Sequence, residues 1–332
     1  MKTKNDPHGT NDRTSSGSGT LVQPHTIYMR EYGPLLSQIS DPPKQLFTAG
    51  DHTLISSALL DQTFDVPGYE PANIKFLCVI GSRKFTDYGK TICESLIKSL
   101  EGLPVIIVSG LALGIDSIAH RSAILHGLKT IAVPGSGLHP SVLYPRSHFN
   151  LANEIIEKGG LILSEYAPNT PASPWSFPIR NRIMAGLSHS ILIIEAEEDS
   201  GTLITARLAL EYNRDVGVIP GSVFSSTSKG PHGLLTKGAA PITSGDDLIK
   251  HLGFKKLENA SSYQPSLFSQ CSSDEKRILA LLTEPRTRDE LVKQSNMSVS
   301  HVQILLSMLE IRKLIKEEYG NIYLIHPFIQ EK

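Results

Sequence analysis

The sequence predicts an α/β protein that carries a second, smaller domain at its carboxyl end. Short, unbroken apolar runs recur between Ile74 and Leu252, and stretches with helical periodicity separate them. This alternation is typical of a doubly wound, mostly parallel sheet, because strands buried on both faces read as continuous apolar runs. After residue 273 the pattern changes to three helices and a hairpin, which is typical of a winged helix-turn-helix domain.

The clearest strand-turn-helix-strand unit spans residues 103–138. Val105–Val108 is a short β-branched run, which indicates a strand buried on both faces. A helical pattern follows, and the turn before it contains Ser109, Gly110 and Gly114. Because unpaired N–H groups and the positive end of the helix dipole meet at such a turn, we expect it to hold an anion.

The rest of the α/β region repeats this unit. Further buried strands are predicted at Phe76–Ile80, Leu161–Leu163, Ile191–Ile194 and Val216–Ile219. Helical patterns are found at Asp87–Leu100 and Thr202–Asn213. We therefore predict a Rossmann-like, doubly wound, mostly parallel sheet, in which ligands bind outside the carboxyl ends of the strands.

The chain divides into five regions. Residues 1–23 are rich in Ser, Gly, Thr, Asn and Asp, so we expect a disordered tail. Residues 24–73, with proline pairs and scattered apolar residues, are expected to form a small, irregular N-terminal extension that leans on the core. The Rossmann-like domain is expected at 74–252, a polar linker at 253–273 and the winged-helix domain at 274–328.

The winged-helix domain is predicted from its helix-start signals. The first helix covers Asp274–Thr283, the second opens at Thr287 with capping-box spacing to Glu290, and Ser298 caps the third. A hairpin centred on Gly320–Asn321 completes the motif. The third helix has few basic residues, so contact with a protein or weak, auxiliary DNA binding is favoured over sequence-specific reading of DNA.

Composition and charge exclude several classes of protein. The chain of 332 residues has a net charge of −1, with 40% hydrophobic and 20% charged residues, which is ordinary for a soluble globular protein. Nucleic acid would therefore have to bind a local basic patch. The three cysteines are scattered without metal-ligand spacing, so we expect no metal site and a protein of the reducing cytoplasm. We also expect no cofactor. No apolar run is long enough to span a membrane, and we expect no membrane contact.

Small, basic and aromatic residues gather after the predicted strands. Arginine side chains match phosphate oxygens, and exposed aromatic rings stack on unpaired bases. Interleaved in this way, they suit single-stranded nucleic acid better than a duplex. The candidate binding residues are Gly81, Ser82, Arg83, Lys84, Ser109, Gly110, Gly114, Arg146, Trp175, Phe177, Arg180, Asn181, Arg182, Ser200, Gly201 and Thr202.

Each of these groups also has a purely structural interpretation. Glycine-rich turns in α/β sheets are often only tight connections, and the two aromatic candidates are alternatively part of the core. Arg180 and Arg182 are alternatively buried ion-pair partners of Glu165 or Glu195. Asp116, in the first turn of a predicted helix, is interpreted as structural. An acid there interacts favourably with the helix dipole, and its negative charge repels a phosphate.

The order of motifs carries a family resemblance. The motifs are GSRKFTDYG (81–89), SGLALGIDSIAH (109–120), TIAVPGSGL (130–138), YPRSH (144–148), SEY (164–166), FPIRNRIMAGLS (177–188), EAEEDSGTLITARLAL (195–210) and VIPGS (218–222). Together they resemble the DprA/Smf family, the DNA-processing proteins of bacterial natural transformation. The resemblance runs from about Tyr32 to Leu252, and more loosely through the winged-helix domain.

The resemblance implies a protein that is not an enzyme. Members bind and protect incoming single-stranded DNA, form a homodimer through the Rossmann-like domain, and load the RecA recombinase onto the strand. Arg83 and Arg146 correspond to basic pocket positions, and residues 177–182 belong to the signature beside that pocket. Leu113 stands where members commonly have arginine, which removes one potential phosphate contact.

Two other functions remain open from the sequence. A nucleotide-binding or nucleotide-hydrolysing Rossmann-like enzyme would use a glycine-rich turn followed by an acid, and the segment 200–202 with Glu211 downstream is similar to that arrangement. A regulator of transcription would sense a nucleotide and read duplex DNA with its winged helix. Deleting everything after Leu257 separates this last function from single-strand binding by the Rossmann-like domain.

Overall fold

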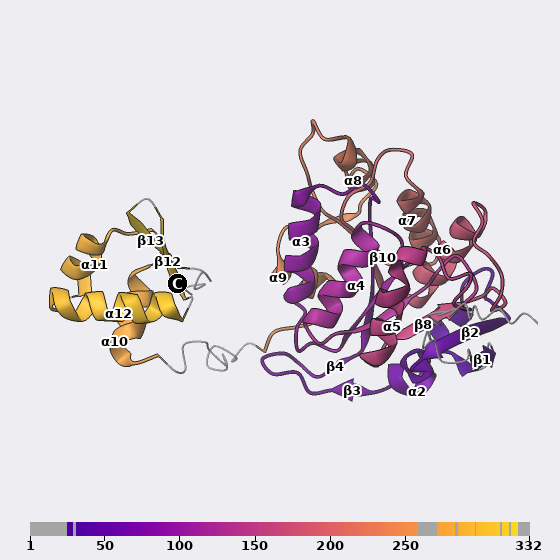
Figure 1. Cartoon of the computed structure of the whole chain (residues 1–332), viewed down its shortest axis with the longest axis horizontal. Helices are drawn as coiled ribbons and strands as arrows, with labels where there is room; N and C mark the ends of the chain where they lie inside the picture. The colour runs from indigo at the N-terminus through magenta and orange to yellow at the C-terminus, as the bar shows by residue number, and fades with distance from the viewer. Residues whose placement is uncertain are drawn as a thin grey trace, which may run out of the picture. The chain divides into compact units, whose positions relative to one another are not determined.

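The computed structural model describes residues 25–28, 31–257, 271–282, 285–295, 297–312, 314–318 and 320–324 (Figure 1). The chain forms two compact units, with the division at Leu257. The predicted tail at 1–23 lies outside the described residues, and so do residues 258–270, most of the predicted linker.

The first unit is built on one sheet of nine strands. Their spatial order is β1-β2-β8-β7-β6-β5-β9-β10-β11. The strands are β1 (His25–Tyr28), β2 (Gln45–Gly50), β5 (Lys75–Ile80), β6 (Val105–Ser109), β7 (Lys129–Ala132), β8 (Leu161–Ser164), β9 (Ser190–Ile193), β10 (Asp215–Val218) and β11 (Ala240–Pro241). The pairings from β8 through β5 to β11 are parallel, and only β1 with β2 and β2 with β8 are antiparallel. The prediction of a doubly wound, mostly parallel sheet is confirmed, and its strand order reverses between β5 and β9.

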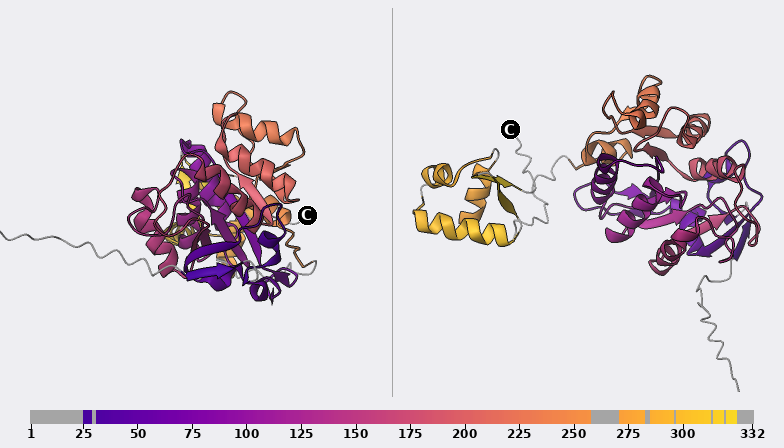
Figure 2. Two further views of the ribbon diagram at one scale, coloured as in Figure 1. Left: turned by 90° about the vertical axis from the view of Figure 1, so that its right-hand side faces the viewer. Right: turned by 45° about the horizontal axis from the view of Figure 1, so that its top comes forward.

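Helices cover both faces of this sheet (Figure 1, Figure 2). They are α3 (Asp87–Lys98), α4 (Ile115–Leu125), α5 (Phe149–Glu157), α6 (Ser176–Leu187), α7 (Gly201–Glu211), α8 (Lys229–Leu235) and α9 (Gly245–His251). Alternate residues of β5 divide between two apolar clusters: Phe76 and Cys78 pack with residues of α6 and α7, whereas Leu77 and Val79 pack with residues of α3 and α4. Each central strand is therefore buried on both sides, which explains its unbroken apolar sequence.

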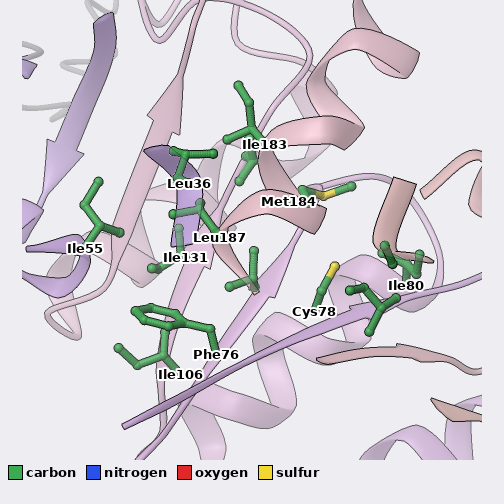
Figure 3. Packing of buried hydrophobic residues seen from close by; sticks show 14 of the residues in the cluster. Leu36, Ile55, Phe76, Cys78, Ile80, Ile106, Ile131, Ile183, Met184 and Leu187 are labelled. Atoms are coloured by element: carbon green, nitrogen blue, oxygen red, sulfur yellow. The ribbon is translucent and has the colours of Figure 1, made fainter. Parts of the chain in front are cut away.

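The first cluster also joins the N-terminal region to the sheet. Figure 3 shows Leu36 of α1 (Pro34–Ser37) among the cluster residues, together with Met184 and Leu187 of α6 and strand residues such as Phe76. The two helices lie close at Gly186, where an added Cβ would come within 2.9 Å of Leu36 side-chain atoms. Gly186 thus permits this packing.

Part of the segment 24–73, expected as an irregular extension, belongs to the main sheet instead. Strand β2 pairs with β8, and β1 pairs with the outer edge of β2. The remaining elements are short: η2 (His52–Ile55), α2 (Ser57–Leu60), β3 (Thr63–Phe64) and β4 (Ala72–Asn73). Strand β1 is the edge strand of the main sheet, and three of its four residues are exposed.

The second unit has its own apolar core and the elements of a winged helix. These are α10 (Ser273–Leu281), α11 (Arg288–Ser295), α12 (Val299–Ile311), β12 (Ile315–Glu318) and β13 (Asn321–Leu324). The predicted capping box is present, since Thr287 N–H donates to Glu290 Oε2 at 2.9 Å and Glu290 N–H donates to Thr287 Oγ1 at 3.3 Å. Ser298 caps α12 as predicted. The winged-helix prediction is confirmed.

Membrane-spanning helices and metal-binding clusters are both absent from the described residues. None of the helices in this part of the chain is long and apolar enough to cross a membrane. Nor do these residues contain a group of three or more His, Cys, Asp and Glu side chains that could hold a metal ion. The three cysteines are buried.

Candidate nucleic-acid interface

A cleft of about 680 Å³ opens at the carboxyl ends of β5 and β9, where the strand order reverses. This is the position at which open α/β sheets bind ligands. Most of the candidate residues line it: Gly81, Ser82, Arg83, Lys84, Phe177, Arg180, Asn181, Ser200, Gly201 and Thr202. The cleft therefore brings together three segments that are far apart in the sequence.

The rim of the cleft combines cations with aromatic rings. Ser82 Oγ accepts a hydrogen bond from Lys84 N–H at 3.0 Å and donates to Lys84 O at 2.8 Å, which holds the turn after β5. This turn exposes Arg83 and Lys84. The Arg83 guanidinium carbon lies 5.5 Å from the centre of the Phe177 ring, and the Tyr144 ring lies 5.6 Å from Phe177 on a tilted plane. Cation and rings thus form one continuous surface.

The turn between β6 and α4, which we expected to bind an external anion, is occupied by a carboxylate of the chain itself. Asp116, only 6% exposed, accepts hydrogen bonds at Oδ2 from Gly110 N–H at 3.0 Å and Ala112 N–H at 3.4 Å. Ser109 Oγ donates to Val79 O at 2.6 Å. The prediction that this turn offers free N–H groups to an external anion is wrong for these two, because the chain's own carboxylate already occupies them.

Gly114 allows two turns of the backbone to approach each other closely. Its φ is +85°, a conformation that favours glycine. A Cβ there would lie 2.3 Å from Ser82 O, so only glycine lets the turn after β6 approach the turn that carries Arg83. Leu113, beside it, is exposed.

Arg180 belongs to the floor of the cleft. It is 5% exposed, and its Nη1 donates to Gly110 O at 2.6 Å and to Val133 O, while its Nε donates to Asn181 Oδ1 at 3.2 Å. Burial lowers the pKa of Arg180, and the nearby Asp116 carboxylate opposes this shift. Burial likewise raises the pKa of Asp116, against the effect of Arg180 and the two N–H donors. Arg180 therefore ties β6 to the end of β7.

Six candidates do not line the cleft: Ser109, Gly110 and Gly114 of the turn between β6 and α4, and Arg146, Trp175 and Arg182. Arg182 Nη2 donates to Glu165 Oε1 and Oε2 at 2.6 and 2.7 Å, which confirms the ion-pair interpretation for this residue. Trp175 is 59% exposed and makes an edge contact with Tyr166. Arg146 is exposed in the 3-10 turn η3 (Arg146–His148).

Sequence reasoning missed several lining residues, among them Thr205 of α7 and Met184 of α6. Each lies one helical turn after a candidate, Thr202 and Asn181 respectively, so helical spacing was the available signal. Glu197 and Asp199 also line the cleft. Positive charge is therefore concentrated on the side of Arg83 and Lys84.

Two protein-family models match the chain. The model of DNA recombination-mediator protein A matches residues 68–253, and that of the DprA winged helix domain matches residues 262–321. The chain belongs to the DprA/Smf family. The DNA processing protein DprA of Bacillus subtilis is 37% identical over 232 residues, which cover 70% of this chain and 72% of the relative. DprA of Streptococcus pneumoniae is 40% identical over 221 residues, covering 66% and 70%.

Solved DprA structures have the same fold. The Streptococcus pneumoniae DprA structure aligns with a TM-score of 0.59 at 37% identity, covering 68% of this chain and 74% of that one. The Helicobacter pylori DprA structure, which concerns that protein's single-stranded DNA binding mode, aligns with a TM-score of 0.57 at 32% identity, covering 69% and 95%. The predicted family is confirmed, and this chain is a DNA-processing protein of the DprA/Smf type.

Proposed function

We propose that this protein binds single-stranded DNA in the cleft, protects the strand, and loads the RecA recombinase onto it without catalysing a reaction itself. The observation that carries the proposal is the rim formed by Arg83, Lys84 and Phe177, with the Arg83 guanidinium 5.5 Å from the ring centre. The DprA relative from Helicobacter pylori, which binds single-stranded DNA, supports it.

The chemistry of the rim favours an unpaired strand over a duplex. Arg83 and Lys84 are exposed cations that can neutralise backbone phosphates. The Phe177 and Tyr144 rings beside them offer faces on which bases can stack, and only unpaired bases have free faces. A cleft of about 680 Å³ has the size of an ordinary small-ligand site, so it can admit one nucleotide but no double helix.

The enzyme alternative is less well supported. Ser200 caps α7, accepting from Thr202 N–H at 3.2 Å, and this helix start lines the cleft. Glu211, the acid that a hydrolase would need nearby, is the last residue of α7 and accepts from Ser40 Oγ. At 1.5 Å per residue it lies about 15 Å along the axis from the helix start. Release of free base from nucleoside monophosphates would revive this alternative.

The regulator alternative is weakened by the surface of α12. Val299, Ile304 and Met308 expose apolar side chains on it, which offer no donor or cation to a base edge. Of the polar side chains exposed there, His301 already contacts Asp274 Oδ2 at 3.0 Å, and Gln303 is left as a potential donor. We infer that the winged-helix domain contacts a protein or assists DNA binding weakly. We also propose that the protein is a homodimer through its Rossmann-like domain, which sedimentation of the full chain would test.

Fluorescence anisotropy with labelled oligonucleotides tests the main proposal. Wild type should prefer single strands to duplex, with an affinity that falls steeply as salt rises. Replacing both Arg83 and Lys84 by alanine should weaken binding by at least about tenfold, since each charged contact contributes about 1.5–3 kcal/mol. Arg121→Ala, which removes an exposed arginine of α4 outside the cleft, is the matched control. Equal affinity of wild type for both forms of DNA would refute the proposal.

RecA loading needs its own assay. RecA assembly on single strands coated with single-strand binding protein should be faster with wild type than without it. The Arg83 and Lys84 double variant should lose this acceleration together with its DNA affinity. No acceleration by wild type would remove RecA loading from the proposal and leave strand binding in place.

A further inference from the structure

We propose that Asp116 is a specificity-determining residue, which excludes free nucleotides and terminal phosphates from the cleft and reserves it for internal nucleotides of a strand. This inference rests on the proposed function, because it concerns the same cleft. Three features of the turn between β6 and α4 support it: a carboxylate occupies the N–H groups of the turn, that carboxylate faces the cleft, and its charge balances a buried arginine.

The first feature is that the Asp116 carboxylate occupies the N–H groups of this turn, where an external anion would otherwise bind. A glycine-rich turn at the start of a helix normally presents N–H groups to a phosphate. Here Asp116 Oδ2 accepts from both Gly110 N–H and Ala112 N–H, at 3.0 and 3.4 Å. The fit is tight, since a Cβ on Gly110 would lie 2.6 Å from Asp116 Oδ2 and 2.3 Å from Arg180 Nη1. No phosphate oxygen can reach these donors while the carboxylate is in place.

The second feature is that Asp116 belongs to the cleft wall although it is 94% buried, its exposed fraction being 6%. Among the described residues, both of its hydrogen-bond donors reach Oδ2, and none reaches Oδ1. The carboxylate thus stands at the cleft as an acceptor, which repels an anion and accepts only N–H or O–H groups.

The third feature is the charge balance. Arg180, 5% exposed, is the buried cation next to Asp116, and it uses Nη1 on two backbone carbonyls. With Asp116 present, the floor of the cleft holds one positive and one negative group. Without it, the floor would hold an uncompensated guanidinium and two free N–H groups, which together make a strong anion site.

The consequence is discrimination by charge. A free nucleotide or strand end carries a phosphomonoester with a charge of about −1.5 to −2 at neutral pH. An internal phosphodiester carries a single negative charge and can stay at the rim beside Arg83 and Lys84, away from the floor. A cell's abundant free nucleotides would therefore not compete with a strand for this cleft.

Two variants test the inference on the full chain. Asp116→Ala frees both N–H groups and removes the negative charge. Asp116→Asn keeps an oxygen that can accept from both N–H groups, removes the charge, and places an NH2 donor where the second oxygen was. The matched control is Asp87→Asn, which changes an exposed first-turn acid of α3 that does not line the cleft. Circular dichroism establishes that each variant is folded.

The readouts are thermal stabilisation by inorganic phosphate and calorimetric binding of a deoxynucleoside monophosphate. Wild type and Asp87→Asn should show neither. Asp116→Ala should bind the nucleotide at least about tenfold more tightly than wild type, and Asp116→Asn should be intermediate. Phosphate should also raise the midpoint of thermal unfolding of Asp116→Ala, because a ligand that binds only the folded state stabilises it.

The outcomes separate this inference from the proposed function. Folded Asp116 variants that bind phosphate and nucleotide no better than wild type would overturn the role of Asp116 and leave strand binding untouched. Nucleotide binding by wild type would overturn it as well. Failure of wild type to bind any single strand would instead refute the proposed function.

Discussion

Arg180 and Arg83 line the same cleft, but Arg180 is buried and Arg83 is exposed. We propose that Arg180 holds the fold and that Arg83 binds DNA, so their alanine variants should differ in stability and in affinity. Arg180→Ala removes the donor to Gly110 O and Val133 O and leaves Asp116 buried without its cation. Leaving one of two neighbouring, buried opposite charges without the other costs about 3–5 kcal/mol. Since domains of this size have a free energy of unfolding of about 5–15 kcal/mol, the loss should be easy to measure.

Urea unfolding followed by tryptophan fluorescence is a suitable assay. Trp175 is the only tryptophan of the chain and lies in the first unit, so its signal reports on that unit alone. With a urea dependence of about 2–3 kcal/mol per M, Arg180→Ala should lower the unfolding midpoint by about 1–2 M. Arg83→Ala, an exposed change, should alter stability by less than about 0.5 kcal/mol and still weaken DNA binding. An Arg180→Ala protein as stable as wild type would refute the assignment of Arg180 to the scaffold.

Two further predictions concern pH and the second unit. Burial lowers the pKa of His120 from 6.5 to about 3, so between these values the unfolded chain takes up a proton that the folded chain does not. Stability should therefore fall as pH falls, by about 2 kcal/mol from His120 at about pH 5, and urea titrations should show a smaller loss in His120→Gln. An equal pH dependence in that variant would show that protonation of His120 does not cause the loss. A chain that ends at Leu257 should keep its single-strand affinity in anisotropy, because the first unit has its own apolar cores. Loss of binding would place the DNA site in the winged helix.

The central strands could be predicted because the local sequence alone indicates that they are buried. Each apolar run, such as Phe76–Ile80, needs no knowledge of its neighbours to be recognised as buried on both faces. Strands β1 and β2 could not be predicted in the same way. Strand β2 pairs with β8, so that Phe47 lies opposite Ser164, and a contact across so many residues leaves no periodic signal.

The candidate site was predictable to a similar degree. The carboxyl ends of parallel strands meet at one edge, so Arg83 and Phe177 were expected to converge, and they do. Roles within the cleft were harder to predict. Arg180 and Arg182 are two positions apart on α6, and residues so spaced point to nearly opposite sides of a helix. One therefore enters the floor of the cleft, and the other pairs with Glu165.

The occupant of the turn between β6 and α4 could not be predicted from the sequence. A glycine-rich turn before a helix has the same sequence signature whether it holds an external phosphate or an internal carboxylate. Only the geometry, with Asp116 Oδ2 at 3.0 Å from Gly110 N, distinguishes the two. This choice determines which ligands the cleft can accept.

Photo-crosslinking tests the central claim most directly. A single-stranded oligonucleotide that carries 5-iododeoxyuridine, bound to the full chain and irradiated, should form crosslinks with the aromatic side chains at the rim of the cleft. Mass spectrometry of the digested complex should locate them at Phe177 and Tyr144, and Arg83→Ala should reduce their yield. Crosslinks found only in residues 271–324, or only on surfaces away from β5 and β9, would contradict the claim that the unpaired strand lies in this cleft.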